Sequence, residues 1–202
     1  RAIQKVLGVD GQRAFQLLAA LAILASLCGF LFATGRPRAS AFPSGADEVV
    51  ISEVYGGGGF STAVYQYDYI ELFNRGTSAV SLSGWSVQYA SYTGSTWSKT
   101  DLPGVSLSPG QYFLIRESTD GPSGAPLPTP DATGGINLAA TRGKVALVNS
   151  TTGLSGPCPT GGTIVDFLGY GASTNCSEGS VAPGGSNTVS VQRASRGCAD
   201  TN

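Results

Sequence analysis

Few side chains in this sequence could carry out catalysis, and histidine, the most versatile catalytic residue, is absent. The chain of 202 residues contains no histidine. Ser-His-Asp hydrolysis, Cys-His hydrolysis and histidine-ligated zinc all need an imidazole, so these mechanisms are excluded. Carboxylates and cysteines are the remaining groups to consider.

Two glutamates could form an acidic pair. Glu53 and Glu71 occupy like positions in two early strand-like segments, and neighbouring carboxylates can divide acid and base work between them. A structural role for these two glutamates is the better interpretation. We predict no catalytic residue, and we expect that the chain is not an enzyme by itself.

We expect the chain to bind no metal ion and no cofactor. A calcium site is the one alternative. Calcium prefers carboxylate and carbonyl oxygens, but the sequence has no DxDxDG run. Aspartates in turns usually accept hydrogen bonds from their own backbone instead. A calcium site would draw on Asp68, Asp120, Asp131, Asp166 and Asp200.

An apolar run over residues 14–34 is preceded and followed by basic residues, as in a signal sequence. Ala39-Ser40-Ala41 supplies the small side chains that a signal peptidase needs, so we predict cleavage after Ala41. The run is also long enough to span a bilayer, and an uncleaved anchor is the alternative. We expect a secreted or extracytoplasmic protein, or one that residues 14–34 anchor in the membrane.

The domain plan follows from this segment. Residues 1–41 are predicted to be a signal peptide or membrane anchor, residues 42–47 a linker, and residues 48–202 a folded domain. Five of the 12 basic residues and one of the 13 acidic residues precede Phe42, which leaves a net charge of -5 from there on. Such a balance disfavours nucleic acid as a partner, and membrane contact is expected only through the N-terminal segment.

Export makes the cysteines candidates for a disulfide. Cys158 and Cys176 bracket a strand-like segment and lie in turn-rich flanks, so their pairing would join the two ends of that strand. A loop of this size contributes about 3 kcal/mol in the chain-entropy model. Cys198 is left either free or paired with a cysteine outside this sequence.

Short strands, rather than helices, must position these groups. The chain has 29 Gly and 11 Pro, which suit tight turns and disfavour long helices. Seven strand-like segments without helical periodicity predict an all-β sandwich. They cover residues 49–55, 69–74, 85–92, 112–116, 144–149, 164–170 and 188–193.

The expected core and the expected surface follow from the same pattern. Leu82, Trp85, Ile70 and Leu72 are predicted to be buried between the sheets. The glycine run at residues 56–59 is expected to form a flexible loop, and residues 118–135 are expected to form a long irregular surface loop.

Aromatic residues give the one candidate contact surface. Tyr89, Tyr92 and Trp97 lie in and after one predicted strand, where exposed rings would offer stacking area to a partner. The alternative is that they cap the core. The partner itself is open: a protein, or a cell-envelope or polysaccharide ligand.

Six motifs in a fixed order resemble a bacterial lamin tail domain. They are ISEVY, DYIELFN, LSGW, LSPGQYFLI, KVALVN and IVDFLGYG. The resemblance covers about residue 47 to the end, and it implies an Ig-like β-sandwich preceded here by a hydrophobic N-terminal signal or anchor helix. The closing CADTN resembles the start of a family segment that continues further, so the C-terminal edge is expected to be truncated.

The resemblance also implies a class of function. We expect a secreted, non-catalytic binding or targeting module. Because such domains accompany secreted hydrolases, one alternative is an accessory N-terminal domain of a longer phosphoesterase or nuclease whose catalytic domain is absent here. A cell-surface structural module that assembles through sheet edges is the other.

Overall fold

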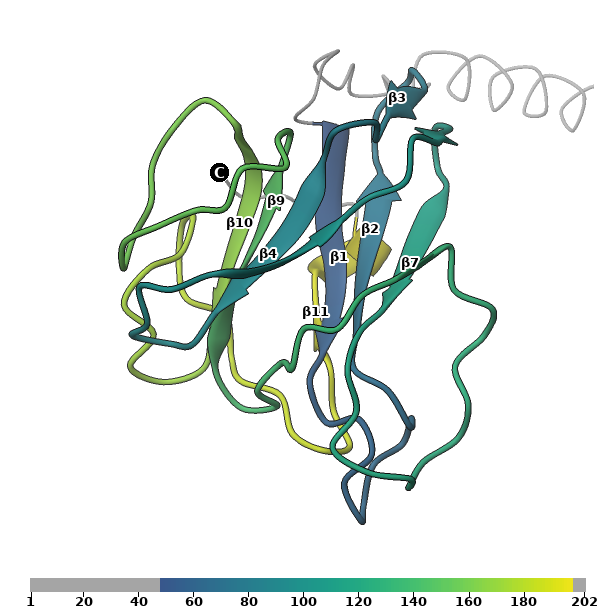
Figure 1. The fold of residues 1–202 in the computed structure, drawn as a ribbon, viewed down its shortest axis with the longest axis vertical. Coiled ribbons are helices and arrows are strands. Elements are labelled where there is room, and N and C mark those ends of the chain that lie inside the picture. The colour runs from purple at the N-terminus through teal and green to yellow at the C-terminus, as the bar shows by residue number, and fades with distance from the viewer. Residues whose placement is uncertain (1–47, 198–202) are drawn as a thin grey trace, which may run out of the picture. The chain divides into compact units, whose positions relative to one another are not determined.

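The described part of the chain is built from strands. The computed structural model describes residues 48–197, so the proposed signal or anchor segment, the linker, Cys198 and Asp200 lie outside it. Within this range there are 11 strands and one short 3-10 helix, η2 (Ala194–Gly197). The predicted all-β sandwich class is therefore confirmed (Figure 1).

Two main sheets form the layers, and a small two-stranded sheet lies beside them. The five-stranded sheet has the order β11-β1-β2-β7-β8 and the four-stranded sheet the order β10-β9-β4-β5. Neighbours pair antiparallel except for the parallel pair β7–β8. The strands are β1 (Val49–Tyr55), β2 (Tyr69–Asn74), β3 (Val80–Ser81), β4 (Ser86–Ala90), β5 (Ser98–Asp101), β6 (Ser106–Leu107), β7 (Tyr112–Arg116), β8 (Ala132–Thr133), β9 (Gly143–Val148), β10 (Ile164–Tyr170) and β11 (Val191–Gln192).

Alternation along the strands fills the space between the two main sheets. Ile70, Leu72 and Leu82 are fully buried there, and Trp85 is 7% exposed. Because successive side chains of a strand point to opposite faces, the aliphatic residues of β2 on one face meet those of β4 and β9 across the gap. These four residues lie in the core, where the sequence pattern had placed them.

A second apolar cluster covers the outer face of the four-stranded sheet. It includes Trp97, Ala146 and Phe167. The polar side chains of the same face are also buried, because the loop after β9 folds across it. Gln88 donates to the carbonyl of Thr152 and accepts from the N–H of Leu154, at 2.9 and 2.7 Å. A face that would otherwise meet water is thus closed by a loop.

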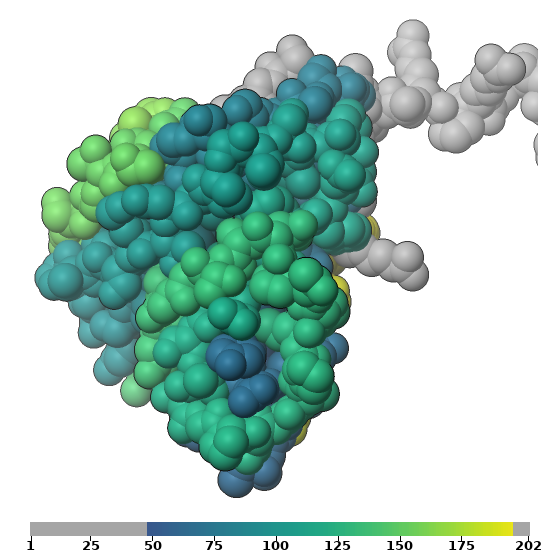
Figure 2. Space-filling view, turned by 45° about the vertical axis from the view of Figure 1, so that its right-hand side comes forward, coloured from purple at the N-terminus to yellow at the C-terminus, as the bar shows by residue number. Residues whose placement is uncertain are grey.

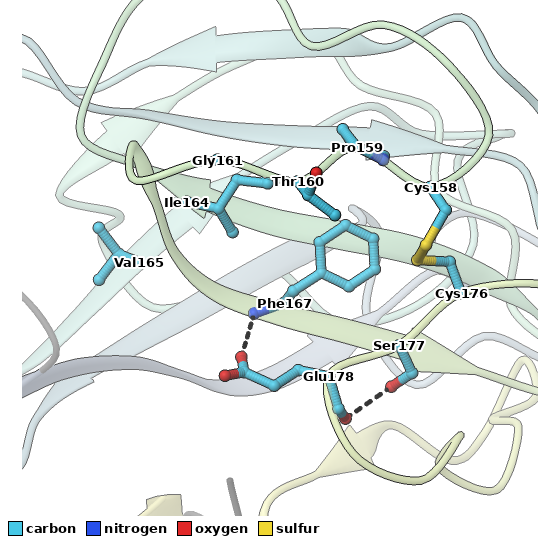
Figure 3. Close-up of a pocket in the computed structure, with 10 residues that line it drawn as sticks. All are labelled: Cys158, Pro159, Thr160, Gly161, Ile164, Val165, Phe167, Cys176, Ser177 and Glu178. Carbon is cyan, nitrogen blue, oxygen red and sulfur yellow. Dashed lines mark hydrogen bonds between the residues drawn. A yellow bond between two sulfur atoms is a disulfide. The ribbon is translucent and has the colours of Figure 1, made fainter.

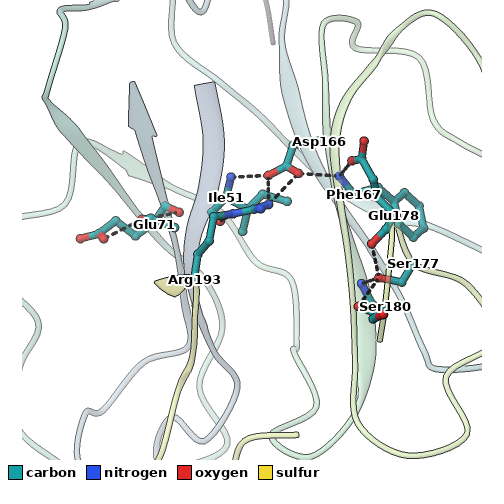
Figure 4. A network of polar contacts seen from close by, with 10 residues as sticks. Ile51, Glu71, Asp166, Phe167, Ser177, Glu178, Ser180 and Arg193 are labelled. Carbon is teal, nitrogen blue, oxygen red and sulfur yellow. Dashed lines mark hydrogen bonds and ion pairs between the residues drawn. The ribbon is translucent and has the colours of Figure 1, made fainter. Parts of the chain in front are cut away.

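Two β-bulges meet where β1 passes β10, and one carboxylate joins them. The strand register shifts between Ile51 and Glu53 in β1 and between Ile164 and Asp166 in β10. Asp166 accepts a 2.6 Å hydrogen bond from the N–H of Ile51 and pairs with the guanidinium of Arg193 at 2.8 Å (Figure 4). Arg193 also donates to the carbonyl of Ile51. Asp166 therefore links the two sheets at their open side.

Long loops pack against each other at the end of the sandwich that lies opposite β3 in Figure 1. Figure 2 shows the loop between β7 and β9 wrapped around the loop between β1 and β2. Backbone hydrogen bonds join them, including Gln66 N–H to the Ala125 carbonyl at 2.8 Å. The loop of residues 118–135 is irregular as predicted, except that β8 ends it with a two-residue strand.

The glycine run is packed rather than flexible, which corrects the expectation from sequence. A Cβ atom at Gly57 would lie 2.5 Å from the Cα of Asn187, and one at Gly58 would lie 2.3 Å from the backbone N of Asp68. Gly59 has a φ of +80°, a conformation that side chains disfavour. Glycine is required here for close backbone contact.

Asp166→Asn is expected to lower the free energy of unfolding by about 3 kcal/mol, because it leaves the partly buried guanidinium of Arg193 without its counter-charge. Urea denaturation measures the loss. Asp101→Asn is the control, since the Lys99–Asp101 pair is exposed and should contribute less than about 1 kcal/mol. Equal stability of Asp166→Asn and the wild type would contradict the role given to this carboxylate.

Candidate functional site

Of the three aromatic residues predicted to form a contact surface, two are buried. Tyr89 and Trp97 are each only 9% exposed. Tyr89 lies in the core and its hydroxyl accepts the N–H of Ala139 at 3.1 Å. Tyr92 is half-buried beneath the guanidinium of Arg142, 3.7 Å from its ring centroid. The alternative, that these rings are packing residues, holds for Tyr89 and Trp97.

The glutamates of β1 and β2 do face each other, as an acidic pair requires. Glu53 and Glu71 are direct cross-strand partners. Burial raises the pKa of Glu71, the hydroxyl of Ser52 lowers it, and Glu53 raises it again. Ser52 donates to Glu71 at 2.7 Å, but Ser52 is only 2% exposed. A substrate cannot reach that hydroxyl, and Glu53 is held by Tyr69 and Gln192.

The most perturbed carboxyls are two that the sequence pattern did not single out as a pair. Asp68 accepts the N–H groups of Gly58 and Leu138, and burial raises its pKa to about 7. Glu117 accepts the Thr100 hydroxyl and the N–H of Ile136, and burial raises its pKa to about 7 as well. Because each carboxylate accepts hydrogen bonds from two separate segments, both hold the packed loops in place.

The aspartates considered for calcium serve separate structural contacts. Asp120 accepts from the Asn137 amide, Asp131 from the N–H of Leu114, and Asp166 from Ile51 and Arg193. Within residues 48–197, no three acidic or cysteine side chains come together in a way that could hold a metal ion.

A pocket opens beside the disulfide at the edge of β10. Cys158 and Cys176 are bonded as predicted, with their Cα atoms 5.4 Å apart. The pocket has a volume of about 280 Å3. Figure 3 shows the ring of Phe167 between Ile164 on one side and the disulfide on the other. The remaining lining residues are Pro159, Thr160, Gly161, Val165, Ser177 and Glu178.

A buried lysine holds both loops of the disulfide in place. The ammonium of Lys144 donates to the carbonyls of Gly94 and Pro157 and to the side chain of Asn175, at 2.8, 2.6 and 2.9 Å. Pro157 and Asn175 directly precede the two cysteines. Burial lowers the pKa of Lys144, and its three hydrogen-bond partners are neutral acceptors. The two loops are thus tied at adjacent points, by the lysine and by the disulfide.

The segment of residues 91–97 supports the pocket from behind. Trp97 donates its indole N–H to the carbonyl of Gly156 at 3.0 Å. Its ring meets Phe167 edge to face, with centroids 5.8 Å apart. The carbonyl of Tyr92 accepts the N–H of Asn175 at 3.0 Å. Trp97 and Tyr92, two of the residues predicted to form a contact surface, therefore support the wall of the pocket from the interior side.

Glu178 lies at the rim and occupies the edge of β10 where another strand could pair. Its carboxylate accepts the N–H of Phe167 at 3.2 Å, and its own N–H donates to the Phe167 carbonyl (Figures 3 and 4). Ser177 accepts the N–H of Gly169 in the same way. The result is an open, mainly apolar pocket with one carboxylate, an arrangement suited to binding rather than to bond cleavage.

Sequence reasoning found the disulfide but missed the pocket around it. Phe167 and Glu178 are 11 positions apart and meet only because the chain turns back along β10. The one usable signal was the pair of turn-rich flanks around the two cysteines, which places their loops side by side.

A family model matches most of the described chain. The model of the family described as Lamin Tail Domain matches residues 43–172. No curated protein matches the chain. The folded unit continues past the matched range, because β11 pairs with β1 through Val191 and Gln192. Across residues 48–197, no helix is long and apolar enough to cross a membrane.

The free energy of unfolding should rise as the pH is lowered from 8 to about 5. Asp68 and Glu117 have folded pKa values of about 7, against 3.8 and 4.5 for the free groups. Between these values the folded state holds protons that the unfolded state releases. Stability is therefore gained as the pH falls through 7, on the order of 2 kcal/mol for each carboxyl.

Glu117→Gln tests this link. The amide keeps an acceptor for Thr100 and Ile136 but carries no charge, so at pH 8 the variant should be more stable than the wild type by about 1–2 kcal/mol. The free energy of unfolding of this variant, measured by urea denaturation, should also depend less on pH. Asp101→Asn should change neither the stability at pH 8 nor its dependence on pH. If Glu117→Gln and the wild type respond to pH alike, the assignment to Glu117 is wrong.

Removing the disulfide with Cys158→Ser/Cys176→Ser is expected to lower the free energy of unfolding by about 3 kcal/mol, because the unfolded chain regains the freedom of the closed loop. Urea denaturation with and without a reducing agent checks this. The wild type should lose stability on reduction and the double variant should not. A double variant as stable as the oxidised wild type would refute the contribution assigned to the bond.

Proposed function

Because the chain belongs to the lamin tail domain family, whose members are non-catalytic Ig-like domains, we propose that it is a secreted binding and targeting module. The pocket beside the disulfide is the observation that carries this proposal. It is concave, lined mainly by apolar groups and open to solvent, and ligands commonly bind at sites of this kind.

The pocket is preorganised, which favours a binding role. Its two loops are joined by the disulfide and by Lys144, so little conformational freedom remains to be lost when a partner binds. A fully buried ammonium with only neutral acceptors lowers stability. Lys144 binds the residues directly before both cysteines, which supports a role in setting the shape of these loops.

Export is supported by chemistry at two places in the chain. A disulfide persists in oxidising compartments outside the cytoplasm, and Cys158 is exposed to solvent. The apolar run with the Ala39-Ser40-Ala41 site fits the same destination. We propose that the module acts outside the cytoplasm, on a protein or a cell-envelope ligand, and does not hydrolyse it.

Assembly through sheet edges is the less favoured role. The edge of β10 is occupied by Ser177 and Glu178, and the other edge of that sheet, β5, carries the charged pair Lys99 and Asp101. Blocked and charged edges oppose strand pairing between molecules. A structural module that polymerises through these edges is therefore disfavoured relative to a binder.

Blocking the pocket should abolish binding and leave the fold intact. Thr160→Trp places a large ring at the exposed rim of the pocket, and Thr151→Trp places the same ring at an exposed threonine that does not line it. The full chain is incubated with cell-envelope fragments of the producing organism and sedimented. We expect the wild type and Thr151→Trp to co-sediment and Thr160→Trp to lose most of its binding.

Two outcomes of this experiment would count against the proposal. Undiminished co-sedimentation of Thr160→Trp, with an unchanged melting temperature, would remove the pocket from the binding surface. Hydrolysis of phosphodiester or phosphomonoester substrates by the purified chain alone would show that the module is catalytic.

A further inference from the structure

Three loops lie together at the end of the sandwich opposite β3 (Figure 1). They are the segments 56–67, 121–130 and 183–190, which together are called the loop tip. The first loop is joined to the other two by backbone hydrogen bonds. Ala125 N–H donates to the Val64 carbonyl at 2.8 Å, and Val64 N–H donates to the Asn187 carbonyl at 3.4 Å. The three loops therefore present one surface.

Apolar side chains are exposed on the loop tip. Phe60, Val64 and Val189 are between 41% and 59% exposed, and they are three of the six exposed large hydrophobic residues in the described part of the chain. Phe60 begins a turn that its carbonyl closes with the N–H of Ala63, and Val189 closes a second turn with Ser186. Exposed apolar groups that gather at one place indicate a contact surface.

The loop tip contains no charged residue. Residues 48–197 include seven basic and ten acidic residues, but none of these lies in the three loops. A protein interface surrounds its apolar centre with a polar rim, whereas a lipid bilayer strongly disfavours charged side chains. The absence of charge therefore favours a bilayer over a protein as the partner of this surface.

The backbone of the loop tip suits the same environment. Peptide groups that enter a bilayer find no water to bind, so they must form hydrogen bonds within the protein. The N–H groups of Gly59, Gln66 and Val189 all donate to carbonyls of the same three loops. Gly57 also packs closely against the backbone of Asn187. Because the loops are already held in place, little conformational freedom is lost on contact.

The charges next to the loop tip indicate which lipids it can meet. Asp120 and Asp131 directly flank the second loop, and both are exposed. One cation lies near the first loop, where the guanidinium of Arg116 stacks on the ring of Tyr67, 4.8 Å from its centroid. Two carboxylates against one guanidinium give no net attraction for anionic lipids. Contact is therefore expected with lipids that carry no net charge.

We propose that the loop tip inserts Phe60, Val64 and Val189 into the surface of a lipid bilayer without net charge. This contact goes beyond the proposed function, since it uses neither the disulfide pocket nor the N-terminal apolar segment. Three partly exposed side chains offer less apolar surface than one fatty acyl chain, which by itself binds a membrane only weakly. The contact orients the module at a membrane and does not anchor it there.

Vesicle sedimentation tests the proposal. Residues 42–202 form a compact unit that contains both sheets, the core and the disulfide, so this part folds without residues 1–41. It is sedimented with phosphatidylcholine vesicles at a large excess of lipid. Val189→Glu should lower the partition coefficient by about tenfold or more, because a carboxylate must then approach the bilayer.

Val105→Glu is the matched control. Val105 is 42% exposed, like the residues of the loop tip, but it directly precedes β6, which pairs with β3 at the other end of the sandwich. This variant should bind vesicles as the wild type does. Adding phosphatidylserine to the vesicles should not strengthen the binding of either protein.

Tryptophan fluorescence shows which end of the domain meets the lipid. Phe60→Trp should be quenched by brominated phosphatidylcholine, and Val105→Trp should not. The wild type gives the background, because Trp85 and Trp97 are buried.

Several outcomes would overturn the proposal. They are a wild type that does not bind vesicles, a Val189→Glu variant with an unchanged melting temperature that binds as well as the wild type, and binding that requires phosphatidylserine. Self-association that Val189→Glu abolishes, without vesicle binding, would show that a second copy covers the loop tip instead. Thr160→Trp should bind vesicles normally, so failure of the pocket and failure of the loop tip can be told apart.

Discussion

The hydrogen bond from Ile51 N–H to Asp166 is the contact on which the arrangement of the two layers depends. The register of β1 shifts directly after Ile51 and that of β10 shifts directly before Asp166, and the hydrogen bond joins the two strands at these irregularities. The charge that this brings into the interior is balanced by Arg193, which follows β11. Asp166 thus fixes the position of β1 relative to β10, and it also binds Arg193 directly after β11.

The position of β10 in turn determines the surface available for binding. β10 is an edge strand of its sheet, and its outer side is covered by side-chain and backbone hydrogen bonds from residues 177–182. Two of the covering residues, Ser177 and Glu178, also line the pocket, and Lys144 and the disulfide join its loops.

The strands and the core were predictable from sequence because both depend on local alternation. β1, β2, β7 and β10 have the boundaries that the pattern indicated, and Leu82 and Trp85 are buried. The four short strands β3, β5, β6 and β8 were missed, since two to four residues carry too little periodicity. The burial of Tyr89 and Trp97 was open, because an aromatic residue near a strand end can face solvent or the core. The pocket depends on contacts between distant loops, which no local pattern encodes.

The crowding around Gly57 and Gly58 has a consequence for how this scaffold could be diversified. Because even a methyl group would collide with backbone there, the loop after β1 cannot tolerate randomisation. The residues between Cys158 and Ile164 are largely open to solvent and held at both ends. A combinatorial library aimed at new recognition properties belongs in that second stretch, where sequence changes leave the architecture untouched.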